Sequence, residues 1–553
     1  MNTLLLIVPP RRTPAALHSA VGIVGVFLSE GERKSICRGG HMNRSKTRSL
    51  LPVLLLPVFC ASSCSGPKTT VVPPGGTATV SLTLVADSLP ANPSILSFKV
   101  SILGITLTPT SGAALTFQPP SPIVIDLMRL QSDTALLGTL INVPSGSYTI
   151  QVSLSMPEIT FLNDTGSTIT ANGQTCSNGA VCSATFTAVG TPTIGSFTFN
   201  ATASGQQGVE LDFNLKNAIS LSTGTLSVNF NPASPNPGVL TAFTLPRTNA
   251  NLGTNQLELI EDFTGVVTIS GNNVTITSNT RGALTATSNS ASFFDPSPDN
   301  AHCLAPTNFM SCVAKGQIAS VDAFLKSDGT LDLKEFEPLN QTQQDFVEGI
   351  VYAVNTPTQF TIAVTDKVLA ATNPLIGGLN IGDRLTVNIG TQPFLVDSKG
   401  LGVQNSFAAD YNLFATQTTT SAVHPGQTVA IHVSALTAAN PAANPPTLAI
   451  ATVDTVILRW SRFRANVVSA TSTTVNIDTP PSYFAIPAST TQEVVQAFLT
   501  GALGTDGVTN LDGVANTTSS LTVGQPVGLR VLYLQNPGNT ANPAFFVAKI
   551  RQP

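Results

Sequence analysis

Few residues of this 553-residue chain have the types and spacing that enzyme chemistry requires. Beyond residue 64, the imidazole side chains are those of His302, His424 and His432. No Gly-x-Ser-x-Gly, His-Glu-x-x-His or phosphate-binding glycine loop accompanies them. His432 alternates with Ile431 and Val433, which is typical of a histidine inside a β-strand. We therefore predict that the chain is not an enzyme and has no cofactor.

Two pairs of carboxylates have the spacing of a same-face pair on a strand. Glu335 and Glu337 are two residues apart, and so are Glu210 and Asp212. Glycoside hydrolysis uses two convergent carboxylates, and a secreted hydrolase of polysaccharide or ester is therefore the alternative function. Solvated polar faces of strands show the same pattern, and we expect solvated faces at both places.

An oxygen-rich loop is the weak candidate for a metal ion. Asp506, Asn510 and Asp512 offer the carboxylate and amide oxygens that calcium prefers, although an ordinary turn uses the same residue types. Residues 324–335 also approach a calcium loop, but Phe324 and Lys326 stand where carboxylates are needed, so that segment predicts a β-hairpin. We predict no metal.

The densest basic segment is residues 459–464. In a strand, its Trp460, Arg462 and Arg464 would share one face. Such a face can be a platform for a sugar ring or an anionic ligand, or a joint between domains where guanidinium groups stack on the single tryptophan. The joint is the favoured interpretation.

The N-terminal region has the pattern of a secretion signal. Arg44, Lys46 and Arg48 precede the almost wholly apolar segment 50–59, and small residues lead to Cys64. This order resembles the lipobox of bacterial lipoproteins, which implies that Cys64 is acylated. We expect Met42 to be the true start and residues 1–41 to be a mis-assigned leader. The mature protein would then be lipid-anchored to the membrane in the cell envelope, facing the periplasm or the cell exterior.

Four cysteines remain after residue 64. Cys176 with Cys182, and Cys303 with Cys312, are local pairs that an oxidising compartment would bond as disulfides. A zinc site with His302 beside Cys303 and Cys312 is the less favoured alternative, because it lacks a paired Cys-x-x-Cys.

The composition excludes two classes of protein. Charged residues make up 10% of the chain, against about 25% in typical soluble domains, whereas 42% are hydrophobic, which argues against disorder. The net charge is −4, so no basic field for nucleic acid exists.

From residue 77 to residue 230, apolar residues alternate with Ser, Thr and Asn between clusters of turn residues. Period two predicts half-buried strands and an antiparallel sandwich. The block Asp-Leu-x-x-Leu, Leu-Leu-Gly, Pro-x-Gly-x-Tyr, which spans Asp126 to Tyr148, resembles the bacterial surface-lipoprotein family catalogued as domain of unknown function 4382. The resemblance implies a prealbumin-like β-sandwich and no known activity. An insertion around Cys176 and Cys182 departs from that family.

Three later stretches open and close alike. Phe263, Phe346 and Phe463 each precede β-branched residues, and a Gly-Gln pair at 316–317, 426–427 and 524–525 precedes each closing strand pair. Recurrent ends with variable middles indicate one repeated unit. The pattern is similar to the small β-barrel family catalogued as domain of unknown function 5666, which implies three barrels. We expect one helix, over residues 491–503.

The fold prediction is therefore all-β: a prealbumin-like antiparallel sandwich followed by three small β-barrel repeats. The predicted parts are a leader (1–41), a lipoprotein signal peptide (42–63), a linker (64–75), the sandwich (76–235), a linker (236–259), and the three repeats (260–340, 341–458 and 459–553). The expected function is that of a non-catalytic cell-envelope lipoprotein that binds a glycan or an envelope protein, or serves as a scaffold. A purely structural spacer is a further alternative.

Overall fold

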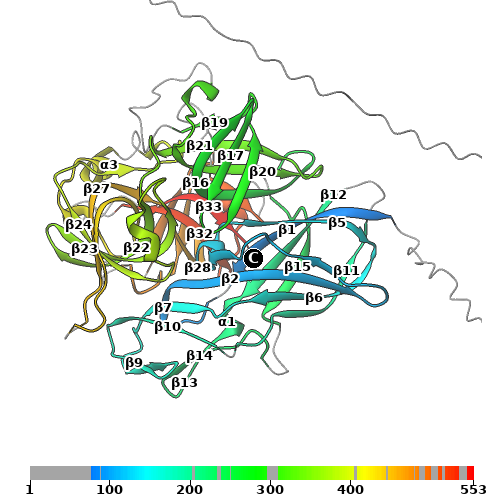
Figure 1. The fold of residues 1–553 in the computed structure, drawn as a ribbon, viewed down its shortest axis with the longest axis horizontal. Coiled ribbons are helices and arrows are strands. Elements are labelled where there is room, and N and C mark those ends of the chain that lie inside the picture. The colour runs from blue at the N-terminus through cyan, green and yellow to red at the C-terminus, as the bar shows by residue number, and fades with distance from the viewer. Residues whose placement is uncertain are drawn as a thin grey trace, which may run out of the picture. The chain divides into compact units, whose positions relative to one another are not determined.

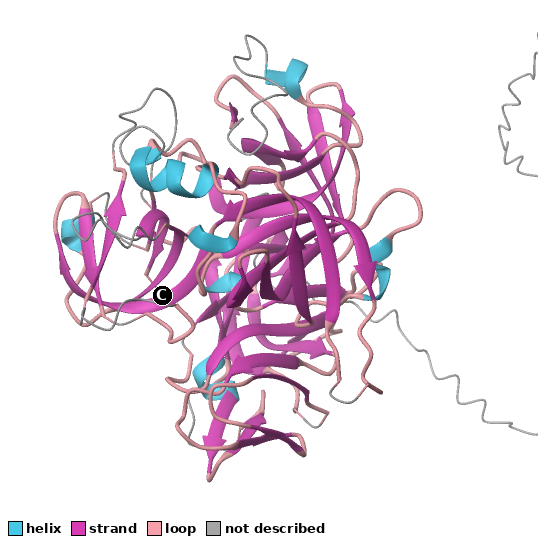
Figure 2. Ribbon diagram, turned by 90° about the vertical axis from the view of Figure 1, so that its left-hand side faces the viewer, coloured by secondary structure: helices cyan, strands magenta, loops and turns pink. Residues whose placement is uncertain are grey.

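The computed structural model describes 14 ranges within residues 76–552: 76–87, 89–187, 189–201, 206–232, 238–249, 251–295, 309–403, 408–443, 446–478, 480–484, 492–499, 509–513, 517–534 and 545–552. These ranges all belong to one unit, Thr69–Pro553. Within them, strands dominate and helices are short (Figure 2). No helix in the described ranges is long and apolar enough to cross a membrane. The predicted leader, signal peptide and Cys64 lie outside the described residues.

The first domain is a sandwich of two sheets (Figure 1). One sheet has the order β15 (Leu240–Leu245), β12 (Gln206–Asn214), β1 (Thr77–Asp87), β5 (Ala135–Pro144). The other has the order β10 (Val181–Thr185), β7 (Glu158–Leu162), β2 (Ser94–Pro109), β6 (Gly146–Leu154), β11 (Thr193–Phe199), with β3 (Leu115–Phe117) and β4 (Ile123–Asp126) also on β2.

Alternating apolar residues of both sheets form one core that includes Leu82, Phe98 and Phe213, as the period-two pattern predicts. Two details were not predicted. Strand β1 pairs with β12 in parallel, whereas its pairing with β5 is antiparallel. Strand β15 completes the first sheet, so the predicted linker at 236–259 contains a strand of the sandwich.

A small third sheet extends the sandwich. Its order is β13 (Ile219–Ser222), β14 (Thr225–Val228), β8 (Ile169–Ala171), β9 (Gln174–Cys176), and the short helix α1 (Leu215–Ala218) leads into β13. The disulfide between Cys176 and Cys182 confirms that predicted pair and ties β9 to β10. Cys312 is also disulfide-bonded, and its predicted partner Cys303 lies outside the described residues.

The described residues from 256 onward form three six-stranded sheets of identical topology. The first contains β16 (Gln256–Ser270), β17 (Asn273–Ser278), β18 (Gly282–Thr287), β19 (Phe293–Phe294), β20 (Ile318–Lys326) and β21 (Leu331–Asn340). The second contains β22 (Phe346–Thr356), β23 (Gln359–Val368), β24 (Arg384–Ile389), β25 (Leu395–Val396), β26 (Thr428–Thr437) and β27 (Ala449–Arg459), with helix α3 (Ala408–Ala415) after β25. The third contains β28 (Ser461–Ala470), β29 (Thr474–Ile477), β30 (Glu493–Ala497), β31 (Asn510–Asp512), β32 (Pro526–Tyr533) and β33 (Phe545–Arg551).

In each sheet the third strand pairs with the sixth, which closes it into a barrel. The predicted all-β fold with barrel repeats is thereby confirmed, and the chain colours of Figure 1 separate the repeats as green, yellow and orange to red. Five short 3₁₀ helices accompany the described strands: η1 (Arg129–Gln131), η2 (Phe309–Cys312), η3 (Leu375–Gly378), η4 (Thr420–Ala422) and η5 (Thr518–Ser520).

The recurrent Gly-Gln pair builds the same turn in each barrel. Each glycine, Gly316, Gly426 and Gly524, has a φ between 81° and 93°, which favours a residue without Cβ. In the first copy, Gln317 accepts a hydrogen bond at its side-chain Oε1 from the Ala314 N–H. The glutamines of the other two copies accept the equivalent bond, from a residue three positions earlier. The local turn therefore explains why the motif recurs.

The predicted helix at 491–503 is wrong where the structure describes that segment. Glu493–Ala497 forms strand β30, which pairs with β29 and, in parallel, with β33. The β-branched Val494 and Val495 suit a strand, and closing the barrel satisfies the strand's backbone on both sides.

Alternation along the barrel strands separates two faces. In β28, Phe463, Ala465 and Val467 point into the core of the third barrel. The intervening Arg462 and Arg464 lie on the outer face of the strand. In β20 the inward residues include Val321, whereas Asp322 belongs to the other face. These outward faces carry the charged residues described next.

Candidate functional site

Equivalent positions of the first and third barrels carry opposite charges. Asp262 lies five residues before Val267, and Arg462 lies five residues before Val467. Each valine exchanges backbone hydrogen bonds with the Gly-Gln turn of its own barrel. Asp322 and Arg530 both stand five residues after the turn's glutamine. The same repeat therefore presents an acid in one copy and a base in the other.

The neighbouring closing strand repeats the pattern. Asp322 pairs across the sheet with Glu335, and Arg530 pairs across its sheet with Lys549. Two residues further along, Glu337 of the first barrel corresponds to Arg551 of the third. The outer face of the first barrel is therefore acidic and that of the third is basic, and the two faces meet.

Asp262 is at the centre of this ionic cluster. Its carboxylate is 1% exposed, and its backbone has a φ of 48° at an irregularity of β16. Five cations surround the carboxylate: Arg530 (2.5 Å), Arg459 (3.4 Å), Arg129 (3.8 Å), Lys399 (4.0 Å) and Arg462 in direct contact. Ser320 also donates its hydroxyl to Asp262, at 3.2 Å. One carboxylate of the first barrel thus joins cations from the other two barrels and from the sandwich.

The second barrel and the sandwich supply the remaining charges. Arg459, at the end of β27, contacts Glu337 at 3.1 Å and also pairs with Asp397. From the sandwich turn η1, Arg129 pairs with Glu348 of the second barrel. Every domain therefore contributes at least one partner to the cluster.

The 3₁₀ turn also connects the sandwich to the third barrel. Asp133, just beyond η1, contacts the Arg462 guanidinium at 2.5 Å. The backbone of β32 also passes close to the η1 turn: a Cβ on Gly528 would lie 2.0 Å from the Gln131 carbonyl oxygen. Glycine at 528 lets the turn rest directly on β32.

Neighbouring cations control the protonation of the acids around Lys399. Burial alone would raise the pKa of Glu337, but Lys399 and Arg459 outweigh burial and hold that pKa at about 2. Lys399 and Arg530 outweigh burial in the same way and hold the pKa of Asp322 at about 2. Burial raises the pKa of Glu335 well above 4.5, and Lys399 offsets only part of that rise. The pKa of Glu335 is therefore shifted upward, whereas the pKa values of Glu337 and Asp322 are shifted downward.

The expectation of solvated carboxylate pairs was wrong. Glu335 and Glu337 are 5% and 1% exposed, and Glu210 and Asp212 are 1% and 6% exposed. Other parts of the molecule cover these faces, as the contact of Arg551 with Glu210 at 3.6 Å illustrates. A strand's alternation assigns a residue to a face but does not say what covers that face.

One group of these acids could hold a cation. Asp295, Glu335 and Glu337 each place a carboxylate oxygen within 4.8 Å of the others. However, the Lys399 ammonium lies 3.4 Å from Glu335 and 3.0 Å from Glu337. This lysine already neutralises the carboxylates, so the arrangement fits an internal ion pair better than a metal site.

The structure separates the three residues of the predicted ligand platform. Trp460 is fully buried between β27 and β28 and packs with the core of the second barrel and with Leu532 and Phe546 of the third. Arg462 lies in the ionic cluster. Arg464 lines a larger pocket and pairs with Asp87 of the sandwich. Trp460 is therefore at the joint and is not a stacking platform.

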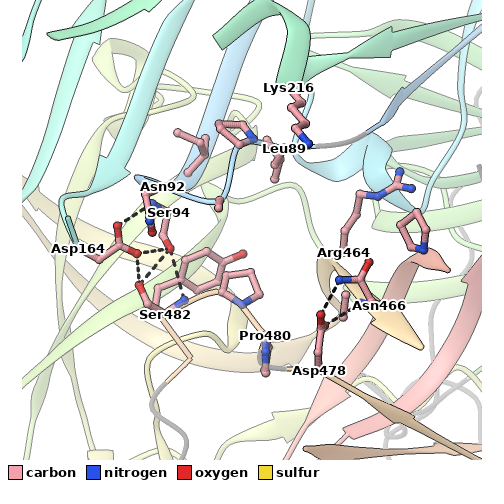
Figure 3. Close-up of a pocket in the computed structure, with 17 residues that line it drawn as sticks. Leu89, Asn92, Ser94, Asp164, Lys216, Arg464, Asn466, Asp478, Pro480 and Ser482 are labelled. Carbon is pink, nitrogen blue, oxygen red and sulfur yellow. Dashed lines mark hydrogen bonds between the residues drawn. The ribbon is translucent and has the colours of Figure 1, made fainter. Parts of the chain in front are cut away.

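That pocket, of about 630 Å³, is the candidate binding site (Figure 3). Its sandwich side comes from residues 89–92, 94, 95, Asp164 and Lys216, and its barrel side from residues 464–466, 478, 480–483 and Pro526. Both domains are needed to form it. The lining mixes carboxylates, amides and hydroxyls with leucine, isoleucine and several prolines.

Two hydrogen-bonded groups line opposite parts of the pocket (Figure 3). Asp164 accepts hydrogen bonds from the hydroxyls of Ser94 (2.7 Å) and Ser482 (2.5 Å). Asp478 accepts hydrogen bonds from the backbone and side-chain amides of Asn466, at 2.7 and 2.5 Å. Among the described lining residues there is no histidine to act as a base for either serine. The groups can instead hydrogen-bond a polar ligand.

The weak metal candidates divide between described and undescribed residues. Asp506 lies outside the described residues. Asn510 accepts a hydrogen bond from Asn251 at 2.7 Å, and Asp512 contacts Lys549 at 3.4 Å and Arg551 at 3.6 Å. The oxygens of these two residues therefore belong to contacts within the protein.

No family model matches the chain, and no curated protein matches it.

Proposed function

We propose that this chain is a non-catalytic cell-envelope lipoprotein that binds a ligand between its sandwich and its third barrel. The observation that carries the proposal is the pocket of about 630 Å³, which lies within the range of about 300–1,000 Å³ typical of ligand sites. A spacer has no need of such a pocket, and the carboxylates that a hydrolase would use are buried against cations.

The ionic cluster supports the scaffold part of the proposal. A pocket with walls from two domains keeps its shape only when the domains hold a fixed relation. Asp133 and Arg462 join the same two domains that form the pocket. Rigid walls lower the ordering cost of binding and so favour affinity.

The binding function can be tested with the mature chain from residue 65. Its binding to purified envelope polysaccharides, peptidoglycan and envelope proteins would be measured, and release of products from polysaccharide and ester substrates would be followed in the same samples. We expect saturable binding without turnover. Turnover that depends on the chain would support the hydrolase instead, and a lack of binding to every component would support the spacer.

The anchoring can be tested separately in cells. We expect the protein in the membrane fraction, with its mass increased by lipid at Cys64, because each buried methylene contributes about 0.8 kcal/mol of membrane affinity. The variant Cys64→Ser should be released or remain unprocessed. A mature N-terminus at another residue, or one without lipid, would contradict lipidation.

A further inference from the structure

Two residues that line the pocket each carry a buried donor group whose hydrogen-bonding capacity is not used. The Nη2 of Arg464 and the hydroxyl of Tyr483 have no hydrogen-bond partner among the described residues. Arg464 uses its Nη1 to pair with Asp87, and Tyr483 is 3% exposed. An unsatisfied buried polar group costs about 1–3 kcal/mol, which a ligand acceptor would recover.

The lining carries two carboxylates and two cations, and an anionic group of a ligand would bind on the side of the cations. The two carboxylates, Asp164 and Asp478, already accept hydrogen bonds from serine hydroxyls and asparagine amides. The two cations are Arg464 and Lys216. A guanidinium presents planar, paired donors that match a carboxylate, and Arg464 retains one of them.

The rest of the lining suits a polyhydroxylated molecule. The carboxylate of Asp164 can accept hydrogen bonds from sugar hydroxyls, and the amide of Asn466 and the hydroxyl of Ser482 can both donate and accept them. Pro480 and Pro481 provide rigid apolar surface for the C–H faces of a ring. The aromatic ring of Tyr483 is too deeply buried to serve as a stacking face.

We propose that the pocket binds an acidic saccharide, with the sugar carboxylate on Arg464 and sugar hydroxyls on the Asp164 and Asn466 sides. This inference rests on the proposed binding function and names its ligand class. Lys216, on the sandwich side, adds a second positive charge for the same carboxylate or for that of a neighbouring sugar.

The test is calorimetric titration of the mature chain with digalacturonate, with the neutral digalactose, and with inorganic phosphate. We expect binding of digalacturonate at least tenfold tighter than that of digalactose. Arg464→Gln should abolish this preference. Equal affinity for both disaccharides, or binding of phosphate as tight as that of digalacturonate, would overturn the acidic saccharide as ligand class.

Two further variants guard against a simple loss of folding. Arg247→Gln removes an arginine that pairs with buried Glu210 at 2.9 Å outside the pocket, and it should leave binding unchanged. Asn466→Ala keeps the pair of Arg464 with Asp87 and should weaken digalacturonate binding several-fold with an unfolding midpoint near that of the parent. Unchanged binding in Asn466→Ala and Arg464→Gln would refute the site. If the chain binds an envelope component but not digalacturonate, only the ligand class fails and the proposed function stands.

Discussion

The substitution Asp262→Asn removes the central negative charge of the ionic cluster with almost no change in volume. The side chain is 1% exposed, and the neutral amide would face Arg459 at 3.4 Å and Arg530 at 2.5 Å. These arginines would keep other carboxylate partners, such as Glu337 for Arg459. Water cannot take the place of the lost charge at this depth.

The expected cost is about 3–5 kcal/mol, which is the range for removing one partner of a buried ion pair. The remaining partners of the arginines place the value toward the lower end. Apolar residues of similar volume can stabilise a buried site as well as an intact ion pair does. The loss arises because the cluster keeps all of its buried cations but has one negative charge fewer to balance them.

The matched control is Asp328→Asn, the same chemical change on the surface. Asp328 is 59% exposed in the hairpin turn after β20, and its cation Lys326 is 3.7 Å away. An exposed pair of this kind contributes about 0–1 kcal/mol. Urea unfolding of both variants, followed by tryptophan fluorescence and circular dichroism, gives the comparison. A cost for Asp262→Asn no larger than that for Asp328→Asn would refute the reasoning.

Three further predictions concern stability. Trp460→Ala should cost about 3–5 kcal/mol, measured by thermal unfolding, because the side chain is fully buried at the joint; a change below about 1 kcal/mol would contradict that role. Replacing both Cys176 and Cys182 by serine should cost about 2 kcal/mol, since the loop that they close is short, and unchanged unfolding would count against it. Burial lowers the pKa of His432 to about 4, so the unfolded chain takes up that proton first and the contribution of His432 to stability should fall as the pH drops from about 6.5 to about 4; buried Asp126 and Asp212, whose pKa values burial raises to about 6, act in the opposite direction. Glu337, with its pKa held at about 2, should add a loss from about pH 4.5 downward; pH dependences of unfolding in His432→Gln and Glu337→Gln that are the same as in the parent would exclude these two effects.

The ends of the repeats could be predicted from sequence because their causes are local. A glycine with positive φ and a glutamine that accepts from a residue three positions earlier are needed wherever this turn occurs. Alternation likewise located β20 and β28 and assigned their residues to faces. The opposite charges of Asp322 and Arg530 were visible once the repeats were aligned on Gly-Gln, and that comparison is the signal that would have indicated the cluster.

What lies against each face could not be predicted from the chain alone. Glu335 and Glu337 have the spacing of a solvated face. Their side chains are buried in contact with Lys399, which is more than 60 residues away in the sequence. Arg464 and Asp164 are 300 residues apart and share a pocket only because two domains meet. At 493–497, the third barrel's need for a closing strand outweighed a plausible helical pattern.

The central claim is that the ionic cluster holds the sandwich and the three barrels together as one binding scaffold. Differential scanning calorimetry of the mature chain tests it most directly. Docked domains that stabilise one another should unfold in a single transition, with equal calorimetric and van't Hoff enthalpies, and Asp262→Asn should split or broaden that transition. Separate transitions in the parent protein, unchanged by Asp262→Asn, would contradict the account.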